Sequence, residues 1–226
     1  LTATTINVDG GGSTTTWYSD PYGRAARTGS FAGAVKQFTQ RGDVVNVTDL
    51  KRLAASPLRL ASEEWGIAVF KVLANLPRSL PGETITMVVF GNTTLDNSSS
   101  NLQTFYFSSV LGQIECDQVP FDGLMITMPD GAGVTFMING AEMTIMGNAS
   151  LQAAQNGEME ISMFSGTASI TSNGGTQIVT AGQSTSMTLG GPDGTTAITG
   201  WRGLTLFLDT LSPPLRCMAW VRPSWA

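Results

Sequence analysis

Histidine is absent from this chain of 226 residues, so few side chains are available for catalysis. Catalytic groups that depend on a histidine base are excluded, and so are metal sites built on imidazole. The three lysines, Lys36, Lys51 and Lys71, lie in no SxxK motif. The glycine run 10–12 lacks the strand-to-helix context of a phosphate-binding loop.

Carboxylate pairs could still do chemistry, because a glycosidase needs only two of them. Three pairs are close in sequence: Glu63 with Glu64, Glu158 with Glu160, and Asp117 with Asp122. No catalytic motif or aromatic sugar platform accompanies them, which favours solvated strand faces and turns. Asp-Gly turns could supply calcium ligands but lack the spacing of a calcium loop. We therefore expect a non-enzymatic protein with no catalytic residue, no cofactor and no metal ion.

The sulfur-containing residues favour structural roles. Cys116 and Cys217 have no histidine partners, so they make a poor zinc site. In an exported protein their simplest use is a disulfide, which would tie the C-terminal segment to the start of the β-rich half. The ten methionines fall mostly on the apolar phase of expected strands, which predicts core packing rather than copper binding.

Charge and sequons indicate the compartment. The net charge of −5 and the lack of a Lys/Arg cluster argue against a nucleic-acid partner. The apolar stretches are shorter than the roughly 20 residues that span a membrane, so no membrane-spanning segment is expected. Sites for glycosylation are predicted at Asn46, Asn92, Asn97 and Asn148. Together with the cysteine pair, they predict an extracellular or cell-surface protein.

Turn residues and alternation predict an all-β fold. From Leu102 onward, Asn-Gly, Asp-Gly and Gly-Gly steps recur roughly every ten residues, as in sandwiches, barrels or solenoid-like stacks. The short strands expected there are 102–110, 123–129, 133–140, 142–146, 149–154, 158–164, 167–172, 176–181, 184–189 and 201–211. Within Glu158–Phe164, Met159, Ile161 and Met163 share one face, which is the period of a half-buried strand. We expect a sandwich or solenoid-like stack of short antiparallel strands, with at most one or two short helices.

The first half of the chain is less regular. Residues 65–77 and 83–91 are predicted strands, and 48–56 is a predicted short helix with Thr48 as its N-cap. The polar run 92–101 is a predicted loop. We divide the chain into four parts: an N-terminal strand or arm (1–16), an N-terminal β-rich domain (17–101), a β domain (102–212) and a C-terminal tail (213–226).

The segment Phe164–Ser184, "FSGTASITSNGGTQIVTAGQS", alternates small-residue strands with glycine turns. Over about residues 110–190 this rhythm resembles the FecR-like β domain of bacterial envelope proteins. The resemblance implies an exported, non-catalytic domain, which in some members is the outer part of an iron-transport signalling protein. Unlike those members, this chain shows no transmembrane helix and no sigma-binding segment. Its N-terminal half looks like the extra region attached to such domains in uncharacterised exported proteins.

The two ends of the chain suggest how it could associate. The segment "TATTINV" places Thr4, Ile6 and Val8 on one side of an extended strand, and the tail carries Trp220, Val221 and Trp225. Our leading hypothesis is a structural protein whose terminal segment adds as a β-strand to copies of itself, forming a filament or layer. The alternatives are a ligand-sensing or signalling envelope module of the FecR type, and a carbohydrate-active enzyme using two carboxylates.

Overall fold

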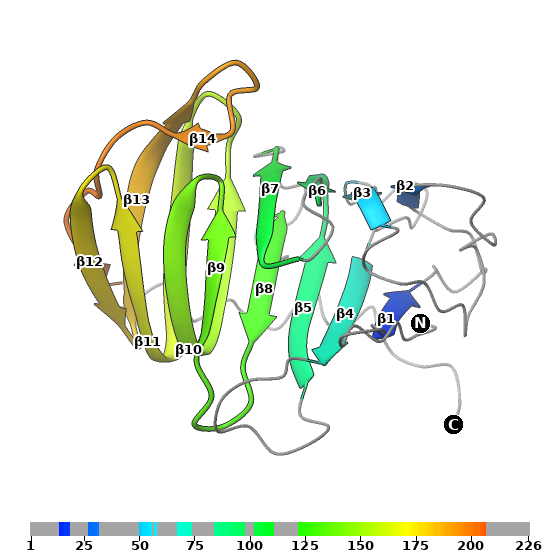
Figure 1. Cartoon of the computed structure of the whole chain (residues 1–226), viewed down its shortest axis with the longest axis horizontal. Coiled ribbons are helices and arrows are strands. Elements are labelled where there is room, and N and C mark those ends of the chain that lie inside the picture. Colours follow the sequence, from blue (N-terminus) through cyan, green and yellow to red (C-terminus); the bar gives the residue numbers. More distant parts are fainter. Residues whose placement is uncertain are drawn as a thin grey trace, which may run out of the picture.

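The computed structural model of the chain describes residues 14–18, 27–31, 50–55, 57, 67–73, 84–97, 102–110 and 122–206, with the backbone alone for 14–18, 27–31, 50, 67–73 and 84. In this part of the chain every regular element is a β-strand and there is no helix. Fifteen strands are joined by hydrogen bonds into one mixed sheet (Figure 1). The all-β class predicted from the sequence is therefore confirmed.

Most strands are short, and two long ones form the centre of the sheet. In chain order they are β1 (Thr14–Tyr18), β2 (Arg27–Phe31), β3 (Leu50–Ala55), β4 (Ile67–Leu73), β5 (Thr84–Phe90), β6 (Thr93–Asp96), β7 (Thr104–Ser109), β8 (Gly123–Thr127), β9 (Val134–Ile138), β10 (Ala141–Ala153), β11 (Glu158–Ser172), β12 (Gly175–Thr180), β13 (Gln183–Gly190), β14 (Thr196–Ala197) and β15 (Thr205–Leu206). The long strands are β10, with 13 residues, and β11, with 15.

The strands β10 and β11 form an antiparallel hairpin that bends in its middle and changes layers. The first half of β10 pairs with β9, and its second half pairs with β8. In the same way, the first half of β11 pairs with β13 and its second half with β12. Strands that pass from one sheet to the other at a bend are the usual corners of folded β-sandwiches.

The bent hairpin divides the sheet into two layers. One layer contains β1, β4, β5 and β8, the second half of β10, the first half of β11, β13 and β15. The other contains β2, β3, β6, β7 and β9, the first half of β10, the second half of β11 and β12. The path of neighbouring described strands runs from β1 to β2 without closing into a barrel. Figure 1 shows the bend at the lower edge of the molecule.

Side chains from both layers pack into one hydrophobic core. Strands β9 and β10 alternate buried and more exposed residues, as expected for strands that cover a core on one face. Phe105 of β7 lies edge-on to Phe136 of β9, with ring centroids 6.4 Å apart. Leu53 and Leu95 come from the same layer, and the opposite layer supplies Ile126. Both halves of the chain therefore contribute to a single core.

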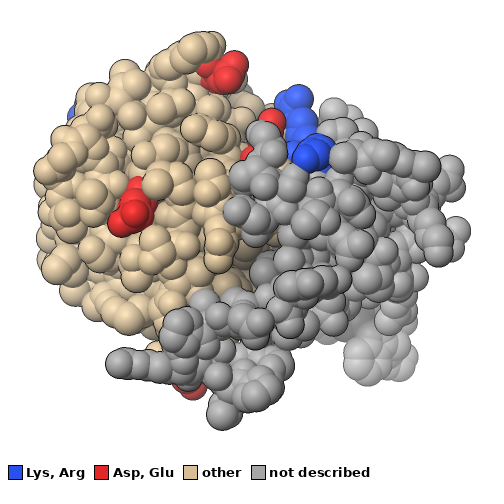
Figure 2. Space-filling model, viewed as in Figure 1, with Lys and Arg blue, Asp and Glu red and all other residues tan. Residues whose placement is uncertain are grey.

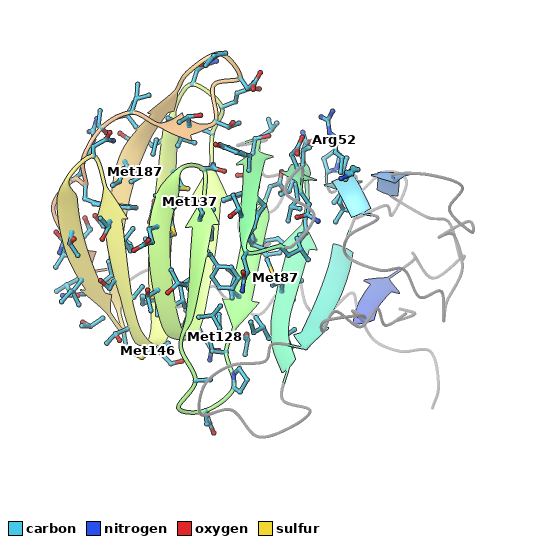
Figure 3. All side chains as sticks on the ribbon, viewed as in Figure 1. Arg52, Met87, Met128, Met137, Met146 and Met187 are labelled. Carbon is cyan, nitrogen blue, oxygen red and sulfur yellow. The ribbon has the colours of Figure 1, made fainter. Side chains whose placement is uncertain are left out.

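Two glycines make the bend possible. Gly147 of β10 and Gly166 of β11 are register partners, and both have positive φ angles, +119° and +74°. A Cβ atom on Gly147 would collide with the main-chain oxygen of Ser165, and one on Gly166 would collide with that of Met146. The two main chains therefore approach more closely than any other residue type allows. Met146, labelled in Figure 3, marks this bend.

A β-bulge beside these glycines keeps the apolar residues pointing inward. The register of the hairpin shifts between Asn148 and Ala149, which leaves Phe164 of β11 as an extra residue. Before the bulge the odd-numbered residues of β11, such as Met163, are buried. After it the even-numbered residues, such as Ala168, are buried instead. The extra residue thus corrects the phase of the strand as it changes layers.

The loop after β13 closes the end of the sandwich opposite the bend. Asn156, in the β10–β11 turn, donates its N–H to the Gly194 carbonyl at 2.8 Å. Ala197 donates its N–H to the carbonyl of Asn139, in the β9–β10 turn, also at 2.8 Å. The Asn139 side chain in turn bonds to the main-chain N and O of Phe107 at 2.7 and 2.8 Å. This loop and one buried amide therefore hold both turns in place.

The helix predicted over residues 48–56 is wrong. Residues Leu50–Ala55 form strand β3, which pairs with β2 and β6. Leu53 and Ala55 are buried whereas Arg52 is exposed, so burial follows a period of two. The helix was predicted because two leucines lie at helical spacing. Pairing with strands that are distant in the sequence outweighs this local preference.

The loop predicted over residues 92–101 is wrong in part, because Thr93–Asp96 form β6. Leu95 is fully buried, and β6 pairs with β3 and β7. Thr93 is also buried, and its hydroxyl donates to the Phe90 carbonyl at 2.8 Å. A polar-looking segment can therefore be a buried strand when its hydroxyls bond to the main chain.

Most of the remaining strand predictions were right in place but wrong in number at the bend, and of the strand predicted at 201–211 the described residues form only Thr205–Leu206, β15. Strands predicted at 65–77, 83–91, 102–110, 123–129 and 133–140 correspond to β4, β5, β7, β8 and β9. The two strands predicted at 142–146 and 149–154 are the single strand β10, and those at 158–164 and 167–172 are β11. The glycines in these strands bend them without ending them. The boundary predicted between residues 101 and 102 lies between β6 and β7, which are paired.

Candidate functional site

The strand β12 lies at an open edge of the sheet. Within the described part of the chain it pairs with β11 alone, and Figure 1 shows it at the left-hand border of the molecule. An edge strand directs half of its main-chain hydrogen-bonding groups away from the sheet. The unpaired side of β12 is the feature that we consider first as a binding site.

Hydrogen bonds at the end of β12 show which of its residues face the open side. Ala181, next to β12, donates its N–H to the Gly166 carbonyl of β11 at 3.1 Å. Thr180 donates its N–H instead to the side-chain oxygen of Gln183 at 3.0 Å. Since bonding alternates along an antiparallel strand, the even-numbered residues of β12 direct their N–H and C=O groups outward. These residues are Thr176, Ile178 and Thr180.

Two glutamine side chains partly cap this edge. The Nε2 atom of Gln177 donates to the Ile178 carbonyl at 3.1 Å. The Oε1 atom of Gln183 accepts from both the N–H and the hydroxyl of Thr180, at 3.0 and 2.8 Å. All three bonds are solvent-exposed, so an incoming strand could replace them with main-chain bonds of similar energy.

The side chains of β12 offer no charge to an approaching strand. Its sequence, GTQIVT, contains no charged residue and no proline. Val179 is fully buried, whereas 59% of Ile178 is exposed. Edge strands are usually protected by lysine, proline, a bulge or a covering loop. In the described structure β12 has none of these protections, and its exposed isoleucine favours contact.

Hydroxyl groups surround this edge on the outer face of the layer. Thr176 of β12 and Thr171 of β11 place their hydroxyl oxygens 3.0 Å apart. On the neighbouring strands, the hydroxyls of Thr135 and Thr144 are 2.7 Å apart. In Figure 2 the described surface is almost entirely uncharged, with a few separated acidic and basic groups. The face beside the edge is therefore polar, and it carries the exposed Glu142 of β10, which is the register partner of Thr171.

The acidic pair at residues 158 and 160 is an exposed feature of the outer face of β11. Glu158 forms an ion pair with Arg202, with 3.0 Å between Oε1 and Nη2. Glu160 accepts a hydrogen bond from the Ser162 hydroxyl at 3.3 Å. Of the other predicted pairs, Glu63, Glu64 and Asp117 lie outside the described residues. In the described part there is no group of three or more acidic or cysteine side chains placed to hold a metal ion.

Asp122 is a partly buried carboxylate whose pKa is clearly shifted. It lies beside Gly91, where the chain passes from β5 to β6, and a Cβ atom on that glycine would collide with the carboxylate. Partial burial raises the pKa of Asp122, and a hydrogen bond from the Asn92 main chain opposes this rise. A lone carboxylate of this kind influences stability, and it has no second acidic partner among its described neighbours.

Methionine packing agrees with the prediction for six residues. Met87, Met128, Met143, Met159, Met163 and Met187 are buried in the core. Figure 3 labels three of them together with Met137 and Met146, of which 36% and 48% are exposed. The buried methionines fill space between the two layers.

The predicted glycosylation sites fall in different environments. Asn97 is fully buried and its Oδ1 atom accepts the Leu102 N–H at 2.9 Å, so this packing has no room for a glycan. Asn92 and Asn148 are half-buried, and modification of either stays a prediction. Asn46 lies outside the described residues.

The other residues singled out from the sequence also lie outside the described residues. They are Cys116 and Cys217 for the disulfide, and Thr4, Ile6, Val8, Trp220, Val221 and Trp225 for assembly contacts. Sequence reasoning predicted the strand β12 but did not recognise it as an open edge. Runs such as TQIVTA and STSMTL look alike, and pairing order alone decides which of them borders solvent. No helix in the part of the chain that the structure describes could cross a membrane.

Comparison with known proteins gives a likeness in structure only. No family model matches the chain, and no curated protein matches it. Two crystal structures of a proposed anti-sigma factor from Parabacteroides distasonis are similar to it, with TM-scores of 0.42 and 0.40 and identities of 9% and 8%. The similarity covers 71% and 70% of this chain but only 63% and 62% of the crystallised chains. We base no functional argument on a likeness at this level, and the FecR-like resemblance stays a prediction.

Proposed function

We propose that this chain is an exported, non-enzymatic structural protein that assembles with copies of itself by β-strand addition at the open edge of β12. The observation that carries the proposal is the uncharged, solvent-facing edge with the exposed side chain of Ile178 at its centre. The product would be a filament or layer outside the cell or on its surface.

Strand addition at this edge would be stabilised by main-chain bonds. Thr176, Ile178 and Thr180 present N–H and C=O groups that an incoming strand can pair, at a net gain of about 1 kcal/mol per bond. The Ile178 side chain would lose part of its exposed area, which adds a hydrophobic contribution. Main-chain pairing supplies affinity in this type of contact, and alternate side chains supply specificity.

The donor that best fits the edge is the N-terminal segment of a neighbouring copy. Residues 2–8, TATTINV, are uncharged and about as long as β12, and they alternate small polar with apolar residues. The second candidate donor is the tail that contains Trp220, Val221 and Trp225. A donor at one site and an acceptor at another make a head-to-tail contact, which grows into a filament unless it closes into a ring.

A lysine substitution at the edge tests the proposal. Ile178→Lys places a charge at the centre of the open edge, and we expect it to weaken self-association at least tenfold in analytical ultracentrifugation. Ser169→Lys is the matched control, because Ser169 is the register partner of Ile178 and lies in the part of β11 that is paired on both sides, with β12 and with β10. The proposal fails if the wild-type chain stays monomeric at high concentration, or if both variants associate alike.

Deletion of residues 1–12 tests the donor separately. The truncated chain should keep its fold, lose assembly, and still accept a synthetic TATTINV peptide. If it assembles like the full chain, the tail becomes the donor to test. A chain that stays monomeric alone but binds a strand of another protein would favour the envelope signalling module.

A further inference from the structure

The outer side of β13 is covered by a segment of the same chain. Residues 196–206, which we call the strap, run antiparallel to β13 and include β14 and β15. Ile198 donates its N–H to the Thr188 carbonyl at 3.0 Å, and Arg202 donates its N–H to the Ser186 carbonyl at 2.8 Å. The strap therefore occupies the edge that would otherwise be open in this layer.

The strap is interrupted by a short hinge. Ala197 pairs with Leu189 and Thr205 pairs with Ser184. Eight positions separate the two strap residues, whereas five separate their partners, so the strap contains three extra residues. The extra residues lie between Ile198 and Arg202, whose N–H groups both donate to main-chain carbonyls of β13. Residues 199–201, Thr-Gly-Trp, are this hinge.

The hinge contains an unsatisfied polar group. The Trp201 side chain packs partly buried against the core, and its Nε1 atom is buried without a hydrogen-bond partner. A buried N–H without an acceptor destabilises the conformation that holds it. Gly200, next to it, has no atom within 4 Å of where a Cβ would lie, whereas Thr199 accepts a hydrogen bond from the Thr188 N–H at its hydroxyl and one from the Asn173 side chain at its carbonyl, both at 2.9 Å.

The rest of the strap is attached by few contacts. Its apolar side chains are largely exposed, with 53% of Ile198, 43% of Leu204 and 68% of Leu206 accessible. The Thr185 hydroxyl donates to the Arg202 carbonyl at 2.6 Å. The Arg202 side chain reaches Glu158 at 3.0 Å, in an ion pair whose side chains are 65% and 47% exposed. The strap is thus fixed by polar bonds in one register while its apolar groups face solvent.

We propose that the covered edge of β13 is a second strand-addition site, and that its partner is the strap segment 202–206 of another copy, exchanged reciprocally to form a closed dimer. The contacts between this segment and β13 are the same within one chain and between two chains. The difference lies in the hinge, where opening lets the Trp201 indole leave the buried position in which it has no acceptor. Exchange of an identical element through a short hinge is a usual route to such dimers. The inference does not depend on the β12 proposal.

The ion pair between strap and sheet offers a direct test. Two variants, Glu158→Arg and Arg202→Glu, are each made together with Ile178→Lys, so that association through β12 is suppressed. Alone, each variant sets like charges against each other when its strap lies on its own sheet. In a reciprocal dimer between the two variants, every strap charge meets an opposite charge.

We expect the equimolar mixture to contain several-fold more heterodimer than either variant contains homodimer, measured by native mass spectrometry with one partner isotope-labelled. Trp201→Phe keeps the ring but removes the N–H, and adding it to both chains should lower the heterodimer fraction several-fold. Circular dichroism of each variant verifies folding. The reference is a mixture of labelled and unlabelled Ile178→Lys chains without the charge changes. If the charge-swapped mixture forms no more heterodimer than this reference, the inference is overturned. It is also overturned if Trp201→Phe leaves the heterodimer fraction unchanged. Because Ile178→Lys blocks β12 in every variant, neither result bears on the filament proposal, which is tested separately.

Discussion

The edges of β12 and β13 lie next to each other in the chain but are protected differently. Both strands are uncharged and rich in Thr and Ser, and they belong to opposite layers of the sandwich. The edge of β13 is covered by the strap, whereas the edge of β12 has two exposed glutamine side chains as caps. The difference shows that connectivity rather than composition decides which edge is free to bind another strand.

The bend that supports both edges should give the largest effect. Gly166→Ala combines a strained positive φ with a collision against the Met146 carbonyl, so we expect unfolding to become easier by roughly 3–5 kcal/mol, or folding to fail. Gly174→Ala is the matched control, because its φ of +79° is similar but no atom lies within 4 Å of its Cβ position. It should cost about 1 kcal/mol. Chemical denaturation measures both, and equal costs would contradict the proposed role of the bend.

Proline substitutions in β12 distinguish residues whose N–H bonds to β11 from residues whose N–H faces the open edge. Val179→Pro removes an N–H that bonds to β11, and should cost about 3 kcal/mol of stability. Ile178→Pro removes an N–H on the open side, so it should cost under about 1 kcal/mol, because proline is tolerated at sheet edges. It should nevertheless abolish self-association in ultracentrifugation. Similar thermal stabilities for the two variants would show that our assignment of the outward-facing residues is wrong.

Asp122 offers a change that affects stability without touching either edge. The pKa of Asp122 is raised in the folded chain, so folding disfavours its ionised form. This destabilisation is fully present at pH values above the folded pKa, and it is lost as the pH falls through that pKa. Asp122→Asn should therefore raise the melting temperature by about 1–3 °C at pH 7. The gain should vanish below the ordinary carboxyl pKa of 3.8. Equal gains at both pH values, or any change in association, would contradict this account.

The ion pair of the strap should give the smallest effect. Glu158→Gln removes the charge that faces Arg202 but keeps the shape of the side chain. Because both partners are largely exposed, the loss should be at most about 0.5 kcal/mol in low salt and less in high salt. Association through β12 should not change. A loss above 1.4 kcal/mol, equivalent to tenfold in the equilibrium, would show a stronger strap than the exposed contacts imply.

The sequence predicted the class of fold and most strands because alternation and turn residues are local signals. Met159, Ile161 and Met163 alternate as expected and are buried. It did not predict the bend, since Gly147 and Gly166 look like strand ends until their mutual pairing is known. The helix predicted at 48–56 failed for a similar reason, because β3 is specified by its partners β2 and β6.

The candidate site was predicted only in part. Residues 176–181 were expected to form a strand, and their lack of charge is visible in the sequence. The open side of β12 depends on the order of strands in the sheet, which no local pattern encodes. The hinge at residues 199–201 depends on the register between β13 and the strap, so it too becomes visible only in the structure.

Amide hydrogen exchange at single-residue resolution tests the central proposal most directly. In the isolated protein the Ile178 N–H should exchange quickly, because it faces solvent, while the Val179 N–H should be protected by its bond to β11. In assembled material the Ile178 N–H should become protected as strongly as that of Val179. Fast exchange of Ile178 in the assembly would contradict strand addition at this edge.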